Sequence, residues 1–206
     1  MEFSQIIKIA SFVVFAFLCG AIPTGYLIVK KRKGIDIRKM GSGNIGSTNV
    51  RRIAGKETAT LVQVLDILKG AIPTALALWA LSIRSNPSIS KELMISMTGI
   101  AAVLGHNYTP FLRFKGGKGV NTTVGAFLII SPISVILAAA SYFISKYTVR
   151  IASVSSIILS IVLLLVVILA HEPTPYVGAA SAACYLILVN HQSNIKRVLK
   201  GQEPRI

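Results

Sequence analysis

A glycine- and cation-rich segment between two apolar stretches contains the residue types that bind phosphate. The run Arg113-Phe114-Lys115-Gly116-Gly117-Lys118-Gly119 places three glycines in four positions and three cations within six residues. Glycine leaves backbone amides accessible, and amides together with Lys and Arg are the groups that hold phosphate. A P-loop requires Ser or Thr after the lysine, and here Gly119 follows, so the segment does not predict a nucleotide site. It predicts a looser oxyanion or phosphate cradle, and a basic turn that binds lipid headgroups is the alternative.

A second polar cluster lies earlier in the chain, where residues 41–52 read GSGNIGSTNVRR. Small hydrogen-bonding residues alternate here with almost nothing apolar, and two arginines close the stretch. Arginine binds phosphate in a bidentate manner, so the cluster predicts a folded-back loop that presents amides, hydroxyls and guanidinium groups. A solvated linker is the alternative interpretation. The candidate residues of this loop are Ser42, Asn44, Gly46, Thr48, Asn49 and Arg52.

A third cluster follows the last apolar stretch. His191 and Asn194 are three residues apart and would share one face of a helix, where they could orient a substrate. His106, which follows Gly105 near the start of the first segment described, is a further candidate. For both histidines a helix-end or interfacial role is the alternative.

The composition identifies a membrane protein. The chain has 206 residues, of which 53% are hydrophobic and only 14% are charged. Its apolar segments are continuous rather than alternating, which predicts an all-α, polytopic fold and not a β-barrel. We expect seven transmembrane helices at 6–29, 57–83, 93–106, 120–131, 133–145, 151–170 and 174–190, forming a single integral membrane domain over residues 1–206.

The positive charges predict the orientation of this bundle. If the N-terminus lies outside, the four inner segments contain 18 of the 22 Lys and Arg residues, and the C-terminus is cytoplasmic. The net charge of +15 then reflects the positive-inside rule, and we expect no nucleic-acid partner. All the dense polar clusters fall on the predicted cytoplasmic side of the cell membrane, where they would contact the edge of the lipid bilayer.

Several residues inside the apolar segments admit two interpretations. Asp66 and Lys69 form a potential ionic pair within a span, which indicates either a functional site or structural support between helices. Ser153 and Ser156 begin the sixth span, where serine usually serves packing. The string GAIPT occurs at 20–24 and again at 70–74, through coincidence or because two helix pairs are pseudo-symmetric. Cys19 and Cys184 are expected to be small buried residues.

The chain lacks the patterns of several other chemistries. Only seven acidic residues occur, with none in the two glycine-rich clusters, so we expect no metal and no other cofactor. Neither a nucleophile-elbow motif nor a Ser–His–Asp triad is expected. A small anion transporter is the rival class, although it would place polar residues deep in several spans. A scaffold that binds anionic lipids would leave the Gly/Asn/Ser pattern unexplained.

In their order and spacing these motifs resemble one family, the bacterial membrane-integral acyl-phosphate:glycerol-3-phosphate acyltransferases. The resemblance covers nearly the whole chain. It is carried by Ser42-x-Asn44-x-Gly46-x-Thr48-Asn49-x-x-Arg52, by Gly105-His106 with Phe114-Lys115-Gly116-Gly117-Lys118-Gly119, and by His191-x-x-Asn194-Ile195-x-Arg197. Asp66-x-x-Lys69-Gly70 also fits. The chain departs from the family pattern at Pro110, Arg51 and Asn121, and Arg52 rather than Arg51 matches the family's arginine.

The resemblance implies a function and a set of roles. It implies acyl transfer from acyl phosphate to the sn-1 hydroxyl of glycerol 3-phosphate, giving lysophosphatidic acid and phosphate in the first acylation of phospholipid synthesis. Catalytic roles are implied for Ser42, Asn44, Lys118 and His191, and substrate binding for Gly46, Thr48, Asn49, Arg52, His106, Lys115, Gly116, Gly117, Gly119, Ser156 and Asn194.

The scarcity of carboxylates in the glycine-rich loops bears on the proton acceptor. We expect a substrate phosphate to act as the base while His191 orients the hydroxyl, with His191 itself or His106 as the alternative base. The sequence leaves the acyl-chain length preference and the oligomeric state open.

Overall fold

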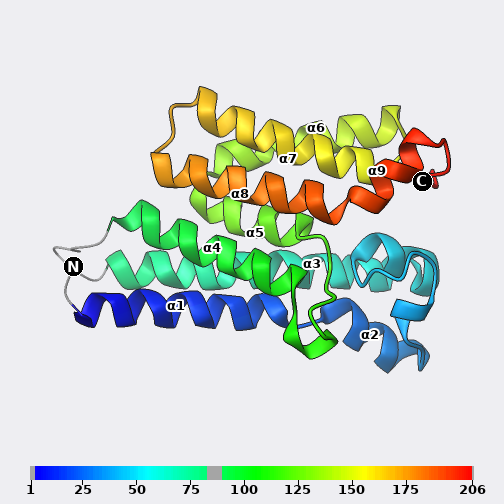
Figure 1. Cartoon of the computed structure of the whole chain (residues 1–206), viewed down its shortest axis with the longest axis horizontal. Coiled ribbons are helices and arrows are strands. Elements are labelled where there is room, and N and C mark those ends of the chain that lie inside the picture. Colours follow the sequence, from blue (N-terminus) through cyan, green and yellow to red (C-terminus); the bar gives the residue numbers. More distant parts are fainter. Residues whose placement is uncertain (1–2, 83–89, 206) are drawn as a thin grey trace.

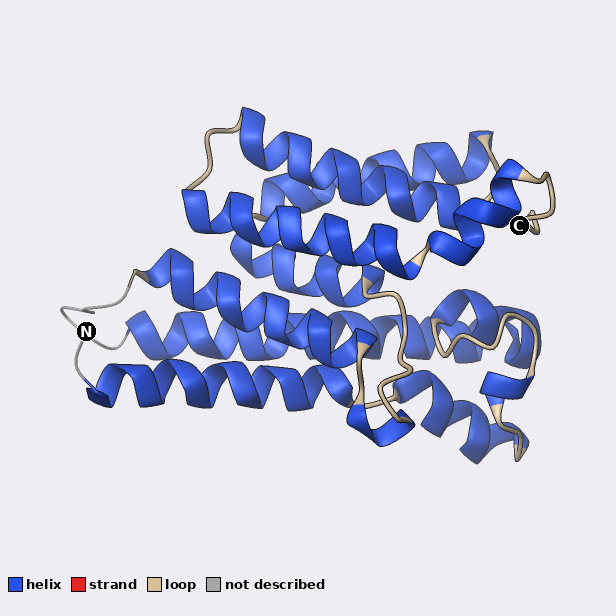
Figure 2. Cartoon of the chain, in the orientation of Figure 1, coloured by secondary structure: helices blue, strands red, loops and turns tan. Residues whose placement is uncertain are grey.

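The apolar segments fold into helices that lie alongside one another in a bundle (Figure 1). The structure is a computed structural model that describes residues 3–82 and 90–205. Helices joined by loops account for the described residues, which contain no strand (Figure 2). The helices are α1 (Phe3–Ala21), α2 (Thr24–Lys33), α3 (Ser47–Ser82), α4 (Lys91–Asn107), α5 (Val120–Ile130), α6 (Pro132–Thr148), α7 (Ala152–Leu169), α8 (Thr174–Asn190) and α9 (Gln192–Leu199), with the short 3-10 turns η1 (Ile37–Lys39) and η2 (Pro110–Leu112).

Each of the seven predicted segments contains a helix, but two of them differ in detail. The first segment is divided at Ile22-Pro23 into α1 and α2, because proline has no amide hydrogen to continue the helix. α3 begins ten residues before its predicted start and is interrupted at Gly55, where φ is 85° and ψ is 172°. The predicted end of that span, Ile83, lies outside the described residues.

Three segments of the described chain are long and apolar enough to cross a membrane. They are Ile6–Lys33, Ser47–Ser82 and Ala152–Leu169, while Val120–Ile130 and Thr174–Asn190 are shorter apolar helices. The short helices pack against longer ones, and the core formed by α3 to α8 includes Phe127, Leu163 and Val167, whose side chains are buried.

Glycines bring two pairs of helices into backbone contact. Gly20 of α1 lies against the carbonyl of Ala102 in α4, and Gly70 of α3 lies against the carbonyl of Thr122 in α5. A Cβ at either glycine would overlap that carbonyl, so only glycine permits the approach. Both glycines open a copy of the GAIPT string, and the two copies therefore occupy equivalent positions in two helix pairs.

A second glycine on the partner helix completes each contact. Gly105 of α4 approaches the backbone of Phe17 and Ala21, and Gly125 of α5 approaches that of Ile67 and Ala71. The prolines of the two GAIPT strings differ in their effect on the helix. Pro23 precedes α2, whereas Pro73 lies inside the continuous part of α3.

The polar clusters gather at one end of the bundle. α1 begins at the left of Figure 1, and α2, the start of α3 and α9 all lie at the right. The glycine-mediated contacts place α4 and α5 against α1 and α3, so the loop between α4 and α5 reaches the same end. This arrangement brings three sequence motifs to one region.

Candidate functional site

A cavity of about 460 Å³ opens among the polar motifs. It is bordered by α3, α5, α6, α7 and the junction of α8 with α9. Twelve of the fifteen residues predicted for the site line it, which brings together positions up to 152 residues apart in the sequence. These are Ser42, Asn44, Gly46, Thr48, Asn49, Arg52, His106, Lys118, Gly119, Ser156, His191 and Asn194.

The first wall is a loop that Asn49 holds together. Its buried side chain accepts a hydrogen bond from the amide of Ser42 (3.0 Å) and donates to the carbonyls of Met40 (3.0 Å) and Asn44 (2.9 Å). Gly41 has a φ of 57° and lies so close to the Asn49 side chain that a Cβ there would overlap it. Asn49 therefore shapes the loop, since its amide group is already engaged in these contacts.

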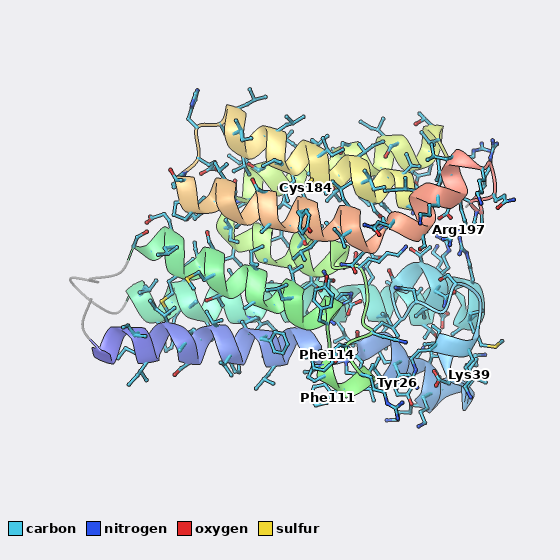
Figure 3. All side chains as sticks on the ribbon, viewed as in Figure 1. Tyr26, Lys39, Phe111, Phe114, Cys184 and Arg197 are labelled. Atoms are coloured by element: carbon cyan, nitrogen blue, oxygen red, sulfur yellow. The ribbon has the colours of Figure 1, made fainter. Side chains whose placement is uncertain are left out.

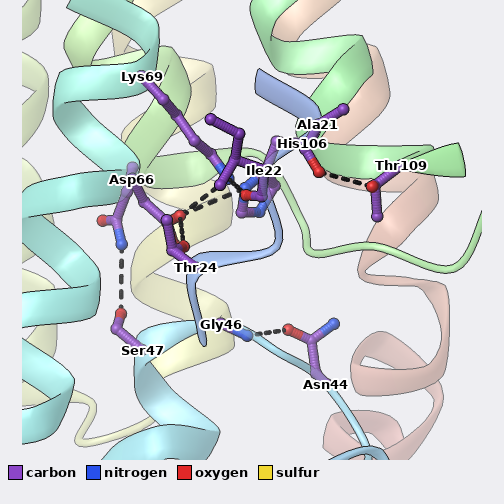
Figure 4. Close-up of polar contacts among 11 residues, drawn as sticks. Ala21, Ile22, Thr24, Asn44, Gly46, Ser47, Asp66, Lys69, His106 and Thr109 are labelled. Carbon is purple, nitrogen blue, oxygen red and sulfur yellow. Dashed lines mark hydrogen bonds and ion pairs between the residues drawn. The ribbon is translucent and has the colours of Figure 1, made fainter. Parts of the chain in front are cut away.

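The same loop delivers polar groups and cations to the cavity. The Asn44 side chain accepts from the amide of Gly46 at 2.8 Å, which fixes the turn that starts α3 (Figure 4). From the second turn of α3, Arg51 and Arg52 both reach the cavity, and both residues are exposed. On the opposite side, the Asn121 amide of α5 donates to the Ser47 hydroxyl at 3.2 Å.

The second and third motifs meet through Lys118. Its ammonium group donates to the side-chain oxygen of Asn194 at 2.5 Å, and the Asn194 amide donates to Glu203 at 2.5 Å. Burial, only partly opposed by the carboxylate of Glu203, lowers the pKa of Lys118 to about 8, and Arg197 and Arg52 add to this effect. Lys118 is therefore a desolvated cation that is mostly charged at neutral pH.

Glu203 balances this cluster. Its carboxylate accepts hydrogen bonds from Asn194, from Arg197 at 2.7 Å and from Ser153 at 2.8 Å. Burial would raise the pKa of Glu203, but these three hydrogen bonds outweigh it and hold the pKa below its usual value. The carboxylate is thus ionised, and it holds Asn194 in place beside Lys118.

His191 presents one ring nitrogen as an acceptor. Nδ1 lies 2.8 Å from the carbonyl of Ile187, an atom that can only accept, so Nδ1 is the protonated nitrogen. Burial lowers the pKa of His191 to about 4, and the nearby charge of Lys118 adds to this shift. The ring is therefore neutral at physiological pH, and Nε2 is a hydrogen-bond acceptor.

Three predicted residues lie outside the cavity, and one expectation is not met. The amides of Gly116 and Gly117 donate to the carbonyls of Asn107 and His106, each at 3.0 Å, and Lys115 is exposed. Because these two amides already have acceptors, they are not available to the expected cradle. The glycines instead allow the chain to pass close to α4, where a Cβ at Gly117 would overlap the ring of His106.

The two serines of α7 differ in their contacts. The Ser156 hydroxyl donates to the carbonyl of Ala152 within its own helix at 2.9 Å, although Ser156 lines the cavity. Ser153 donates to Glu203 and is thereby joined to Asn194. Of the two, Ser153 is the serine connected to the cation cluster.

A buried ion pair lies beneath the cavity. Lys69 Nζ is 2.9 Å from Asp66 Oδ1 and donates to the carbonyl of Ile22 at 3.0 Å (Figure 4). Thr24 donates to Asp66 at 2.6 Å, and His106 Nδ1 lies 3.7 Å from the same carboxylate. These contacts join the α1–α2 break to α3 and α4, so Asp66 and Lys69 support the floor of the cavity.

Sequence reasoning missed several residues of the site. Glu203 had a signal, since it is the one acidic residue in a tail from 191 to 205 that contains four Lys and Arg residues. Asn121 was noted only as a departure from the family pattern. Gln63, Tyr142, Phe143 and Lys146 also line the cavity. They belong to none of the three motifs because the first three lie in the predicted apolar spans that became α3 and α6, and Lys146 directly follows the latter span.

The charged groups of the cavity do not form a metal-binding cluster. Within residues 3–82 and 90–205, no group of three His, Cys, Asp or Glu side chains is placed to hold a metal ion. The hydrogen-bond donors that line the cavity are amides, hydroxyls and cations, and these groups bind anions.

Fold and site together define an all-helical integral membrane protein with a cation-lined polar cavity at one end of its bundle. The sequence model of the family described as glycerol-3-phosphate acyltransferase matches residues 10–201. A crystal structure of PlsY (YgiH), described as an integral membrane glycerol 3-phosphate acyltransferase in its glycerol 3-phosphate form, superposes with a TM-score of 0.89 and 38% identity, covering 97% of this chain and 96% of that one. Its lysophosphatidic acid form gives a TM-score of 0.86 and 37% identity, covering 97% and 95%.

Curated relatives agree with this match. A glycerol-3-phosphate acyltransferase of Clostridium acetobutylicum is 47% identical over 191 residues, 93% of this chain and 96% of the relative. One from Rippkaea orientalis is 39% identical over 197 residues, 94% of this chain and 91% of the relative. The chain therefore belongs to the glycerol-3-phosphate acyltransferase family, and the resemblance inferred from the motifs is confirmed.

The buried ion pair makes a testable prediction. Replacing Lys69 by Met leaves the Asp66 carboxylate without its cation in a low-dielectric site, which costs about 3–5 kcal/mol. For a chain of this size we expect the melting temperature in detergent to fall on the order of 10 °C, measured by the reaction of buried Cys184 with a thiol-specific dye.

Lys91, an exposed residue at the start of α4, provides the control. Lys91→Met should melt near the wild-type temperature, and Asp66→Asn combined with Lys69→Met should recover part of the loss. Equal melting temperatures for Lys69→Met and Lys91→Met would contradict the role of the pair.

Proposed function

We propose that this protein transfers a fatty acyl group from acyl phosphate to the sn-1 hydroxyl of glycerol 3-phosphate. The observation that carries the proposal is the meeting of Lys118, His191 and Asn194 with Arg52 around one cavity. Both substrates carry phosphate, and a cavity with a desolvated ammonium and an exposed guanidinium suits two such groups. The products would be lysophosphatidic acid and inorganic phosphate.

The cluster around Lys118 suits glycerol 3-phosphate. Lys118 and Arg52 would bind the phosphate, while Asn194 and the α7 serines would hydrogen-bond to its oxygens or hydroxyls. Because Glu203 already orients Asn194 and Ser153, these groups are held in place before the substrate arrives. Preorganisation of this kind lowers the entropy that must be lost on binding.

The opposite wall suits the acyl phosphate. Ser42, Asn44 and Gly46 line the cavity beside Arg51, and the Ser42 hydroxyl and the Asn44 side-chain amide are donors that can stabilise a phosphate or a developing oxyanion. Of the glycines at 116, 117 and 119, Gly119 lines the same cavity. The apolar lining from Ile67, Val124 and Leu159 offers a path for the acyl chain between helices.

The reaction requires little from the protein beyond position and charge. The sn-1 oxygen attacks the acyl carbonyl carbon, the bond from that carbon to the phosphate oxygen breaks, and phosphate leaves with the electron pair. A substrate phosphate accepts the proton of the sn-1 hydroxyl, while neutral His191 accepts a hydrogen bond at Nε2 from the neighbouring glycerol hydroxyl and so orients the glycerol. A pKa of about 4 makes His191 a weak base at neutral pH, which favours this assignment. His106 is a poor candidate, because Gly117 covers its Nε2 edge.

The orientation in the membrane is part of the same proposal. Seven of the helices, α1 and α3 to α8, would span the cell membrane as one domain over residues 1–206, with the N-terminus outside. The cations of α2, the first turn of α3, the α4–α5 loop and α9 would then all face the cytoplasm, as the positive-inside rule requires.

The identity of the acyl donor is tested by incubating purified protein with glycerol 3-phosphate and one candidate donor at a time. We expect phosphate release with palmitoyl phosphate and no product with palmitoyl-CoA, because the cavity holds phosphate groups rather than a nucleotide. Phosphate release is measured colorimetrically, and lysophosphatidic acid is measured by mass spectrometry. Product from palmitoyl-CoA, or none from palmitoyl phosphate in a folded sample, would refute the assignment.

The lowered pKa of Lys118 predicts an alkaline limit. Lys118 binds phosphate when protonated, so kcat/KM for glycerol 3-phosphate should fall as pH rises through about 8. In Lys118→Arg the guanidinium stays charged to about pH 12, and the fall should move to higher pH even if the maximum is reduced. The profile is measured between pH 6 and pH 10, with correction for spontaneous hydrolysis of acyl phosphate.

His191→Gln and His191→Ala complete this experiment. Glutamine keeps a hydrogen-bonding group, so His191→Gln should retain more activity than His191→Ala and should keep the fall near pH 8. If both variants were equally inactive, and the wild-type profile had an acidic limb that they abolished, His191 would be the general base.

A further inference from the structure

The loop between α4 and α5 projects two phenylalanines outward. Phe111 and Phe114 are 62% and 65% exposed, while Leu112 between them is buried. Arg113 and Phe114 both adopt left-handed backbone conformations, with φ of 55° and 60°. Left-handed backbone is unfavourable for bulky residues, so the surrounding structure imposes it.

Hydrogen bonds make this projection rigid. The amide of Phe114 donates to the carbonyl of Thr109 at 2.9 Å, and that of Arg113 donates to Pro110 at 3.2 Å. The Thr109 hydroxyl donates to the carbonyl of Ala21 at 2.6 Å, which ties the loop to the end of α1. The outward position of the two rings is therefore a property of the folded loop.

The connection to Ala21 gives the depth of the loop in the membrane. α1 has 19 residues and is about 28 Å long, close to the roughly 30 Å of hydrocarbon in a bilayer. α1 alone therefore crosses the hydrocarbon, and its end at Ala21 lies at the boundary with the headgroups. Figure 1 shows the loop beside the α1–α2 junction at the edge of the bundle, so it lies at this same level.

The charges beside the rings match an anionic surface. Arg113 and Lys115 are exposed and flank Phe114 in the sequence. Figure 3 shows Tyr26 along the same edge as Phe111 and Phe114, and the cations of Arg38 and Lys30 lie 4.9 and 5.5 Å from the centre of its ring. Aromatic rings with adjacent cations are typical of the headgroup layer of membranes.

We propose that residues 110–115 form an anchor that inserts Phe111 and Phe114 into the headgroup layer of anionic phospholipids. Arg113 and Lys115 bind the lipid phosphates, and the rings rest on the upper part of the acyl chains. The loop continues directly into Gly116 and Lys118, so the anchor holds this side of the cavity at the depth where an acyl phosphate in the bilayer presents its head. The proposal of an anchor depends on the membrane location of the protein and not on the proposed reaction.

Depth-dependent fluorescence quenching tests the anchor. In a Trp79→Phe background, which removes the single tryptophan, Phe114→Trp is introduced into the full chain. The protein is reconstituted in vesicles of phosphatidylcholine and phosphatidylglycerol. We expect lipids brominated near the headgroup to quench the indole at least twofold more than lipids brominated at the chain end, and acrylamide to quench it weakly.

Two matched variants control for position and folding. Met40 is exposed in the loop that follows η1. The indole of Met40→Trp should therefore be quenched by acrylamide and not by brominated lipid. Phe111→Trp should behave as Phe114→Trp does. Removing the cations with Arg113→Gln and Lys115→Gln should raise acrylamide quenching of the Phe114→Trp indole in anionic vesicles and leave it unchanged in pure phosphatidylcholine.

The opposite results would overturn the proposal. If the Phe111→Trp and Phe114→Trp indoles matched the Met40→Trp control, the loop would lie in water. If the anionic lipid fraction had no effect, headgroup binding by Arg113 and Lys115 would be wrong. None of these measurements requires turnover, so their failure is distinguishable from failure of the proposed acyl transfer.

Discussion

The buried contact between Asp66 and Lys69 holds together the parts of the chain that form the cavity floor. A carboxylate and an ammonium in a bilayer-spanning bundle are stable only when each has a partner, because no bulk water solvates them. Lys69 also donates to the carbonyl of Ile22, and Asp66 accepts from the Thr24 hydroxyl, so the pair ties α3 to the break between α1 and α2. The break gives α2 its own direction and leaves room for the loop of residues 34–46 above the site.

Glycine contacts determine how close the supporting helices lie. Gly20 and Gly105 join α1 to α4, and Gly70 and Gly125 join α3 to α5, each through backbone contact that a Cβ would prevent. These contacts fix the ends of α4 and α5, and therefore the path of the segment between them. Lys118 lies in that segment, so its position beside Asn194 depends on the packing of the helices that border the cavity.

The motifs were predictable because their residue types are rare in apolar segments. The hydrogen-bond partners of the motif residues were not predictable in this way. Asn49 and Asn194 belong to similar polar strings, yet Asn49 maintains the loop while Asn194 contacts Lys118. Glycine spacing alone could not show that the amides of Gly116 and Gly117 donate to carbonyls of α4. That pairing depends on how the chain turns back onto the end of α4. The helices themselves followed from hydropathy, whereas the division at Pro23 is accompanied by contacts from Lys69 and Asp66 that hydropathy does not reveal.

The measurement that tests the account most directly is the fate of the acyl group when labelled glycerol 3-phosphate and palmitoyl phosphate meet the purified protein in vesicles. The account predicts one lysophosphatidic acid, acylated at sn-1, for each phosphate released, because in the proposed mechanism both substrates are bound in one cavity. Release of palmitate and phosphate without lysophosphatidic acid would show that water, and not a bound glycerol 3-phosphate, attacks the acyl group, and that result would contradict it.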